Sequence, residues 1–315
     1  MTTALKNERQ ALIFALLAVL CWSTVATAFK LALDVFSARW LLAIAVTTSW
    51  LFLTCVLVFK QQLGDALQSL LAQPWLNLRN AMINPVCYYL LLFQAYDLLP
   101  AQQAQAINYT WAITMSLLAI PLLGQKLRLR DQIALLLAYL GVLIIATRGD
   151  VVSLQFDSVT GVLLALASTI LWALYWILNT LDARKTRQAN PAVGMWASFL
   201  IAAPVTLMIA IATDGFPASG SDNLLTGLAA SVYIGLFEMG LTFLLWQHAM
   251  NLTSNTAAIS SLIFLSPFLS LVFISQILGE PVEAATLYGL IMIVAGLAIQ
   301  KLALKRTTNA RGGKR

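Results

Sequence analysis

Residues 233–250, YIGLFEMGLTFLLWQHAM, form an apolar stretch long enough to cross a bilayer as a helix, with a carboxylate, Glu238, near its middle. An ionised side chain at the centre of a bilayer costs roughly 2.5 to 3.5 kcal/mol on insertion scales, so such a residue is normally neutralised, paired or turned toward a wet cavity. We therefore expect Glu238 to be functional. The alternative is a protonated, hydrogen-bonded glutamic acid that only joins two helices.

The composition of the whole chain is that of a polytopic membrane protein. Of its 315 residues, 60% are hydrophobic and 10% are charged, and its mean hydropathy is +0.82. Soluble proteins carry about 25% charged residues. The three cysteines, Cys21, Cys55 and Cys87, lie in apolar runs, which argues against a disulfide framework, and the single histidine, His248, does not complete a metal site with them. The first apolar run is about 20 residues long, and we expect it to be retained as a helix and not cleaved as a signal peptide.

Ten apolar segments have the length of a membrane-spanning helix. They cover residues 11–30, 38–59, 78–98, 102–123, 131–148, 159–180, 193–212, 226–248, 255–278 and 283–303. The connections between them are short, and none would hold a second soluble domain.

The positions of lysine and arginine predict the orientation. With a cytoplasmic N-terminus, sixteen of the nineteen basic residues fall on the cytoplasmic side, and six of these lie in the tail 301–315. Only Lys30, Arg39 and Arg148 fall outside. By the positive-inside rule both termini are predicted to be cytoplasmic, with the tail as a flexible anchor on anionic lipid head groups.

The two halves of the chain repeat weakly. A shift of 150 to 155 residues places Trp172 on Trp22 and Gly296 on Gly141. Each half holds five spans, an odd number, so the halves enter the membrane in opposite directions, as in secondary transporters that bind substrate between inverted repeats. The predicted fold is an all-α membrane protein with ten transmembrane helices in two inverted five-helix repeats, 11–148 and 159–303, followed by a basic cytoplasmic tail, 304–315.

The same repeat places Asn84, which directly precedes Pro85, opposite Glu238 at a shift of 154 residues. Matched midplane positions of an inverted repeat approach each other across its pseudo-two-fold axis. We therefore expect the two polar groups to lie at matched depth. In the alternative interpretation Asn84 only bonds a neighbouring helix, as polar side chains in membranes do.

Three stretches resemble the EamA-type members of the drug/metabolite transporter superfamily: CWSTVATAFKLAL (21–33), SARWLLA (37–43) and NTAAISSLIFLSPFLSLVFISQILGEPV (255–282). The last contains Pro267 of the ninth span and the sequence Leu278-Gly279-Glu280. The resemblance implies ten helices in inverted repeats and export of small metabolites across a bacterial inner membrane.

A narrower resemblance lies in the fourth span, where INYTWAI (107–113) followed by LGQKL (123–127) is similar to the aromatic amino acid exporters of this family and their N-Y-x-W-P run. This chain departs from that pattern at Ala112, where the proline is missing. Glu238 is a second departure, because the family usually has a small or hydroxyl residue in that part of the eighth span.

Aromatic and amide residues recur at helical spacing inside several spans, and such a lining suits an amphipathic ligand with a ring and a polar end. Trp172 and Trp176 share a predicted face with Asn179, as do Asn84 with Tyr88, and Asn108 with Trp111 and Met115. The alternative is ordinary helix packing. The candidate substrate-binding residues are Trp22, Asn84, Tyr88, Asn108, Trp111, Trp172, Trp176 and Glu238.

Pro267 is predicted to kink the ninth helix, because proline removes a backbone donor and clashes with the preceding turn. The kink is either a gating hinge or a static bend. Lys30 and Arg39 flank the first outer connection, where they attract a substrate carboxylate, snorkel to head groups or pair with Asp34. His248 lies ten residues from Glu238, about 15 Å along a helix and too far for direct proton transfer.

No catalytic motif appears: the sequence has no G-x-S-x-G, H-E-x-x-H or P-loop. We expect no enzyme activity, no cofactor, no metal and no nucleic-acid partner. The predicted function is export of amino acids or similar metabolites, aromatic amino acids above all, by an alternating-access carrier of the bacterial inner membrane. Its partners would be a small-molecule substrate, lipid and protons, with Glu238 as the proton-coupling residue, and it would be a monomer or homodimer. The alternatives are proton-coupled efflux of cationic drugs through Glu238, and a non-transporting membrane receptor or assembly factor.

Overall fold

The computed structural model describes residues 7–124, 129–153, 156–185, 191–217, 223–255, 259 and 261–312, and these ranges are helical with no strand among them. The first half contains α1 Glu8–Leu33, α2 Ala38–Phe59, α3 Leu63–Ala72, α4 Pro74–Ala81, η1 Met82–Cys87, α5 Tyr88–Leu98, α6 Ala101–Asn108, α7 Trp111–Leu123 and α8 Leu129–Ala146. The second half contains α9 Val159–Lys185, α10 Pro191–Asp214, α11 Leu224–Phe237, α12 Leu241–Leu252, η2 Leu262–Leu265, α14 Ser266–Phe273, η3 Ile274–Leu278 and α15 Ala284–Gly312.

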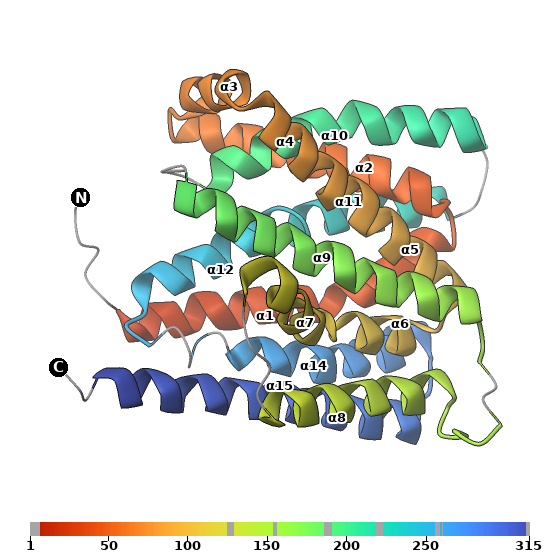
Figure 1. Ribbon diagram of the computed structural model, residues 1–315. Coiled ribbons are helices and arrows are strands. Elements are labelled where there is room, and N and C mark those ends of the chain that lie inside the picture. The colour runs from red at the N-terminus through yellow and green to blue at the C-terminus, as the bar shows by residue number, and fades with distance from the viewer. Residues whose placement is uncertain are drawn as a thin grey trace.

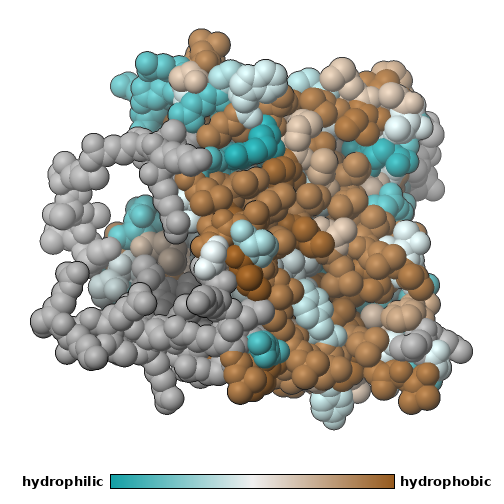
Figure 2. Space-filling model, in the orientation of Figure 1, coloured by the Kyte–Doolittle hydropathy of each residue, from teal (hydrophilic) through white to brown (hydrophobic). Residues whose placement is uncertain are grey.

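Within the described ranges, six helical stretches are long and apolar enough to cross a membrane. They are Glu8–Leu33, Ala38–Phe59, Ala101–Leu123, Val159–Asp182, Ala192–Asp214 and Leu224–Leu252, and shorter apolar helices cover Gln132–Ala146, Leu262–Leu278 and Ala284–Ile299. The helices form one bundle in which α1 begins and α15 ends at the same end (Figure 1). On the face shown in Figure 2, hydrophobic residues cover most of the middle of the molecule, as a lipid-facing surface requires.

Glycines bring pairs of helices into close contact. α8 and α15 meet at Gly141 and Gly289, where a Cβ added to Gly141 would lie 2.5 Å from the Gly289 carbonyl oxygen. A Cβ on Gly235 of α11 would likewise collide with the Ala45 carbonyl oxygen of α2. Small residues allow this approach because association in lipid depends on van der Waals packing.

Two predicted continuous helices are interrupted, which corrects the expectation for 78–98 and 226–248. In the first, Asn84 has extended backbone angles (φ −146°, ψ 116°) inside the π-helical turn η1, and the following Pro85 supplies no N–H for the helix. In the second, α11 ends at Phe237 and α12 begins at Leu241, so Glu238 lies in the break. The two breaks therefore fall on the residues that the 154-residue shift placed opposite each other.

Backbone groups freed at the second break find side-chain partners. The Ser49 hydroxyl of α2 donates to the Met239 carbonyl oxygen at 3.1 Å, and the Thr242 hydroxyl donates to the Phe237 carbonyl oxygen. Unsatisfied backbone groups cost several kcal/mol in lipid, so these hydroxyls stabilise the interruption.

The fourth and ninth spans are interrupted as well. α6 and α7 are separated at Tyr109 and Thr110, although Ala112 stands where a proline would favour such a break. In the ninth span the 3₁₀ turn η2 leads into α14, and Pro267 occupies the first turn of α14. The predicted disturbance of the ninth helix at Pro267 takes the form of a change of helix type in the preceding turn, where η2 is a 3₁₀ turn, and proline is well suited to the first turn of the α-helix that follows.

The last helix is longer than predicted. α15 continues to Gly312, whereas the sequence predicted a span that ends at residue 303 and a flexible tail over 301–315. Residues 304–312 include leucine, lysine, arginine and alanine, which favour a helix, and no proline. Basic residues are also favourable near a helix C-terminus.

Candidate functional site

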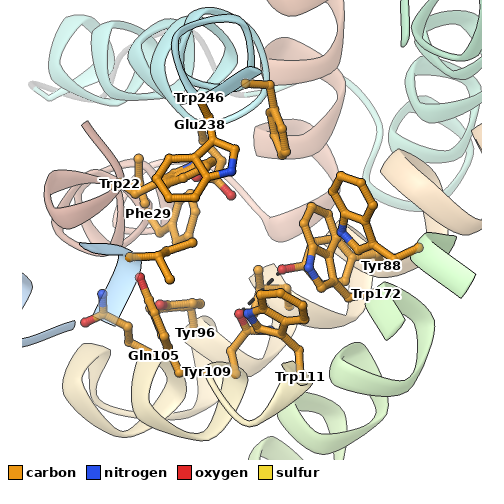
Figure 3. A pocket seen from close by; sticks show the side chains of 16 residues that line it. Trp22, Phe29, Tyr88, Tyr96, Gln105, Tyr109, Trp111, Trp172, Glu238 and Trp246 are labelled. Carbon is orange, nitrogen blue, oxygen red and sulfur yellow. Dashed lines mark hydrogen bonds between the residues drawn. The ribbon is translucent and has the colours of Figure 1, made fainter. Parts of the chain in front are cut away.

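A cavity of about 150 Å³ lies in the middle of the bundle (Figure 3). We call it the central cavity. It is lined by Trp22, Val25, Phe29, Tyr88, Leu92, Tyr96, Gln105, Asn108, Tyr109, Trp111, Trp172, Trp176, Glu238, Phe243, Trp246 and Ile263. Seven of the eight predicted substrate-binding residues are in this lining, and the eighth, Asn84, is not.

Aromatic rings form most of the wall of the central cavity. Trp172 of α9 has its ring centroid 4.6 Å from that of Tyr88 and 6.0 Å from that of Phe243. Trp22 of α1 lies against Trp246 at 5.5 Å. In Figure 3, Trp22 and Trp246 face Tyr88 and Trp172 across the cavity. Such walls suit a flat or hydrocarbon body.

Glu238 is the single acidic residue in the lining of the central cavity, and that lining, as far as the structure describes it, holds no lysine, arginine or histidine. The side chain is buried, with 8% exposure. Its Oε1 accepts a hydrogen bond from the Tyr89 hydroxyl at 3.0 Å, whereas Oε2 is buried without a hydrogen-bond partner. A carboxylate in such a place is suited to bind a cation or to exchange a proton.

The other polar groups of the central cavity are neutral. The Tyr88 hydroxyl points to Asn108 Oδ1 at 3.4 Å, and Asn108 Nδ2 donates to the Ser168 hydroxyl at 3.0 Å. α6 and α7 position Asn108 and Trp111 on either side of the turn at Tyr109 and Thr110. The amide and phenol groups fix orientation, while Glu238 supplies the charge.

A second cavity, of about 230 Å³, adjoins the first, and we call it the amide cavity. It is lined by Asn80, Asn84, Tyr89, Tyr175, Trp176, Asn179, Gly194, Met195, Phe199 and Phe243. Trp176 and Phe243 line both cavities. Asn84 and Tyr88 therefore do not share a face as predicted, because the extended backbone at Asn84 breaks the helical spacing between them.

The predicted approach of Asn84 to Glu238 takes an indirect form. The hydrogen bond to Glu238 comes from Tyr89, which also lines the amide cavity with Asn84. Tyr89 was missed from the sequence, as were Tyr96, Gln105, Tyr109 and Trp246 in the central cavity. Two of these residues could have been predicted from their spacing: Tyr109 follows Asn108 directly, and Trp246 lies one helical turn after Phe243. The Tyr89 contact spans 149 residues, and no local pattern reveals it.

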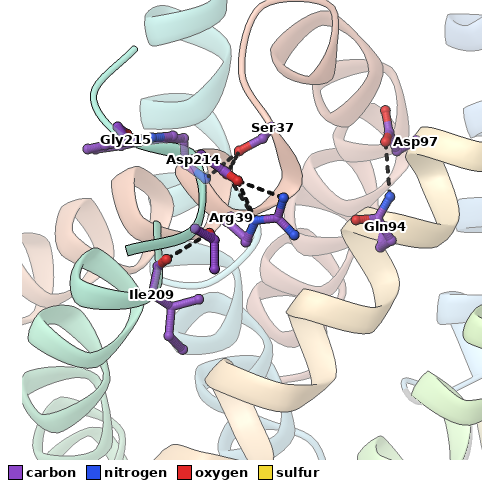
Figure 4. A network of polar contacts seen from close by, with 9 residues as sticks. Ser37, Arg39, Gln94, Asp97, Ile209, Asp214 and Gly215 are labelled. Carbon is purple, nitrogen blue, oxygen red and sulfur yellow. Dashed lines mark hydrogen bonds and ion pairs between the residues drawn. The ribbon is translucent and has the colours of Figure 1, made fainter. Parts of the chain in front are cut away.

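Polar contacts join helices at the end where α1 meets α2 (Figure 4). Arg39 forms an ion pair with Asp214 at 2.7 Å, and the Ser37 hydroxyl donates to the same carboxylate at 2.5 Å. Lys30 Nζ donates to the Tyr96 and Leu99 carbonyl oxygens at 2.8 and 3.2 Å. Arg39 and Lys30 therefore have partners other than Asp34, which was one of the predicted alternatives, and these contacts hold helix ends.

At the opposite end, the start of α1 is bonded to the end of α12. The Glu8 carboxylate accepts hydrogen bonds from the Thr253 hydroxyl at 2.7 Å and from the Ser254 amide at 2.6 Å. Arg79 pairs with Asp182 at 2.5 Å, beside the amide cavity. Across the part of the chain that the structure describes, no group of three or more His, Cys, Asp or Glu residues is placed to hold a metal ion.

The sequence matches the model of the EamA-like transporter family twice, over residues 9–147 and 159–300. "Uncharacterized transporter YvbV" of Bacillus subtilis is 29% identical over 232 residues, covering 73% of this chain and 72% of that protein. "Aromatic amino acid exporter YddG" of Ancylobacter novellus is 23% identical over 239 residues, covering 76% and 80%. A solved structure titled "Crystal structure of protein" has the same fold, with a TM-score of 0.63 and 21% identity over 96% of this chain and 99% of that one.

Proposed function

Because the chain belongs to the EamA-like transporter family, we propose that it exports small amphipathic metabolites across the bacterial inner membrane, with aromatic amino acids as its favoured substrates. The observation that carries this proposal is the central cavity, whose aromatic wall surrounds one buried carboxylate. The relative from Ancylobacter novellus, named as an aromatic amino acid exporter, favours the same substrate class.

The proposed architecture is ten spans in two inverted repeats, with both termini in the cytoplasm. Three observations support it. The family model matches each half of the chain separately, both halves interrupt a helix at matched residues, Asn84 and Glu238, and α1 begins at the end of the bundle where α15 ends (Figure 1). Substrate sites of such carriers lie between the repeats, on discontinuous helices.

The proposed cycle is alternating access around the central cavity. The substrate ring lies between Trp22 and Trp172, and its ammonium group lies against Glu238. Polar contacts close each end of the bundle, Arg39 with Asp214 at one and Glu8 with Ser254 at the other. Helix interruptions such as the one before Pro267, the proposed hinge, let a span bend without separating all of its contacts.

Glu238 is also the proposed site of proton exchange. Its carboxyl group would bind a proton when the substrate leaves and release it when an ammonium group arrives. The titratable side chains that face it or share its cavity are the tyrosines Tyr88, Tyr89, Tyr96 and Tyr109. Because these are neutral near pH 7, Glu238 is the group whose charge can follow the substrate.

Uptake of radiolabelled amino acids into proteoliposomes tests the proposal. Glu238→Gln keeps the shape of the side chain but removes its charge, so the apparent affinity for aromatic amino acids is expected to fall about tenfold or more, as for the loss of a buried charge contact. The pH dependence of transport should also flatten. Unchanged rates and pH dependence would reduce Glu238 to a packing role, and no uptake of any amino acid by the wild type would overturn the assignment itself.

Asp150→Asn is a suitable control because this carboxylate is exposed and lies between α8 and α9, outside both cavities. The Ser153 amide donates to it at 3.1 Å and holds the pKa of Asp150 below its usual value. The control is therefore ionised throughout the range in which Glu238 is tested.

Efflux of cationic drugs is a second candidate. It is favoured by the combination of one carboxylate with no basic residue in the described lining of the central cavity. Cells that express the protein should then survive higher concentrations of lipophilic cations, and Glu238→Gln should abolish the gain. Equal survival with and without expression would exclude this candidate.

A further inference from the structure

Two hydrogen-bond acceptors in the cavities have no partner. Glu238 Oε2, in the lining of the central cavity, and Asn84 Oδ1, in that of the amide cavity, are both buried and accept no hydrogen bond. Asn84 is 7% exposed. A buried acceptor without a donor costs about 1–3 kcal/mol, and most such groups in proteins are paired. Each of these two can therefore accept a hydrogen bond from a molecule that enters its cavity.

Among the groups beside Asn84, the Tyr175 hydroxyl contacts the Asn84 amide group, but Asn84 Oδ1 itself has no hydrogen-bond partner. Asn80 Nδ2 already donates to Asn179 Oδ1 at 3.0 Å, and Asn179 Nδ2 donates to the Tyr175 carbonyl oxygen at 2.8 Å. The nearby guanidinium of Arg79 is bound to Asp182. A molecule that enters the amide cavity thus meets an acceptor in Asn84, and no lysine, arginine or histidine belongs to the described lining.

The two acceptors are related by the internal repeat. A shift of 154 residues places Asn84 on Glu238, and each lies at a break in its span. Tyr89, Trp176 and Phe243 separate the cavities: Trp176 and Phe243 line both, and Tyr89 lines the amide cavity while it donates to Glu238. The acceptors therefore stand on the two sides of one aromatic partition.

We propose that Asn84 and Glu238 are two successive binding stations for the ammonium group of one transported molecule. This inference rests on the proposed export function and specifies its substrate class. The recognised group is a protonated amine on an aromatic body, and a carboxylate on the same molecule meets no basic side chain in the described lining of either cavity. Aromatic monoamines should then bind at least as well as aromatic amino acids.

The position of the amide cavity gives the order of the stations. On α9, Trp172 and Trp176 line the central cavity, whereas Trp176 and Asn179 line the amide cavity. The amide cavity is therefore nearer the end of α9 at Lys185. That end lies where α1 begins and α15 ends (Figure 1). A molecule that enters from the terminal end reaches the neutral acceptor Asn84 first and the acidic acceptor Glu238 second.

A competition panel in proteoliposomes tests the recognised group with the full-length wild-type protein. Labelled tryptophan and labelled tryptamine are each offered with unlabelled tryptamine, which lacks the carboxylate, or indole-3-propionate, which lacks the amine. Unlabelled tryptophan is the reference competitor. We expect tryptamine to compete at least as well as tryptophan and indole-3-propionate to have no effect. Competition by indole-3-propionate but not by tryptamine would overturn the inference while leaving export intact. If neither labelled compound is taken up or bound, the export function and the inference both fail.

Two variants test the station at Asn84. Asn84→Asp adds a charge to the acceptor, so the Kd of tryptamine should fall about tenfold, which corresponds to about 1.4 kcal/mol, and turnover should slow because the amine is held there. Asn84→Leu removes the acceptor and should raise the Kd. If Asn84 had only a structural role, both substitutions would change the Kd in the same direction, and that result would overturn the station.

Discussion

At the scale of single residues, the importance of Glu238 can be predicted from the sequence, whereas its hydrogen bond with Tyr89 cannot. A carboxylate in an apolar segment is visible because its cost in lipid is large, and the structure places Glu238 in the central cavity with six other predicted lining residues. Its donor, Tyr89, has no comparable signature, since a tyrosine in a membrane span is unremarkable. The long-range hydrogen bond becomes evident only when α5 and the break after α11 are folded together.

At this scale we expect Tyr89→Phe to destabilise the protein. The substitution removes the hydroxyl that donates to Glu238 Oε1, so both carboxylate oxygens would be buried without a donor. The cost should be about 1–3 kcal/mol, seen as a lower midpoint of thermal unfolding in detergent. Tyr88→Phe is the matched control, because its hydroxyl makes a longer contact, 3.4 Å, with Asn108. A larger loss for Tyr88→Phe would contradict the expected order.

At the scale of elements, hydropathy predicts where apolar helices lie but not where they stop being helical. Pro85 marks the break at Asn84, because proline is a known interruption. Nothing comparable marks the break at Glu238, where Gly240 is one of many glycines in membrane helices. A neighbouring helix stabilises this break, because the Ser49 hydroxyl of α2 donates a hydrogen bond to the Met239 carbonyl oxygen. Such support comes from a neighbouring helix and is absent from local sequence.

Gly240→Ala should disturb this break. An added Cβ would lie 2.9 Å from Phe52 Cδ1 and 3.1 Å from two backbone carbonyl oxygens, so the chain must shift. Overpacking of this kind typically costs about 1–3 kcal/mol, measurable as a lower unfolding temperature in detergent. Gly64→Ala in α3 is the control. Its Cβ would meet nothing within 4 Å, and alanine favours a helix by about 1 kcal/mol. Equal destabilisation of the two variants would show that space at Gly240 is not the cause.

At the scale of the molecule, the distribution of basic residues and the internal sequence repeat predict the overall organisation. The internal repeat anticipated two matches to one family model, one in each half. The lysine and arginine bias predicts cytoplasmic termini, and this stays a prediction; in the structure α1 begins at the end of the bundle where α15 ends (Figure 1). Cavities are harder to predict, since they depend on how side chains from both repeats fill the space between them.

Reporter fusions should reveal the sidedness that the basic residues predict. Green fluorescent protein fused after Arg315 should fluoresce, because it folds in the cytoplasm, whereas a fusion after Val152, between α8 and α9, should be dark. Alkaline phosphatase, which is active outside, should give the reverse pattern at the same two sites. Fluorescence at Val152 with none at Arg315 would invert the proposed orientation, and the positive-inside rule would then fail for this chain.

The chemical difference between Asn84, a neutral amide, and Glu238, an acid, affects the kinetics of a carrier that opens to both sides of the membrane. Two identical inverted halves would give the molecule equivalent inward and outward states, and substrate would half-saturate it at the same concentration from either side. A neutral amide in one half and an acid in the other remove that equivalence. No carrier alters the equilibrium set by the gradients, so under the proposed amine transport this difference would act on rates alone. An amine would then be held more tightly at one stage of its passage than at the stage related to it by the pseudo-two-fold axis.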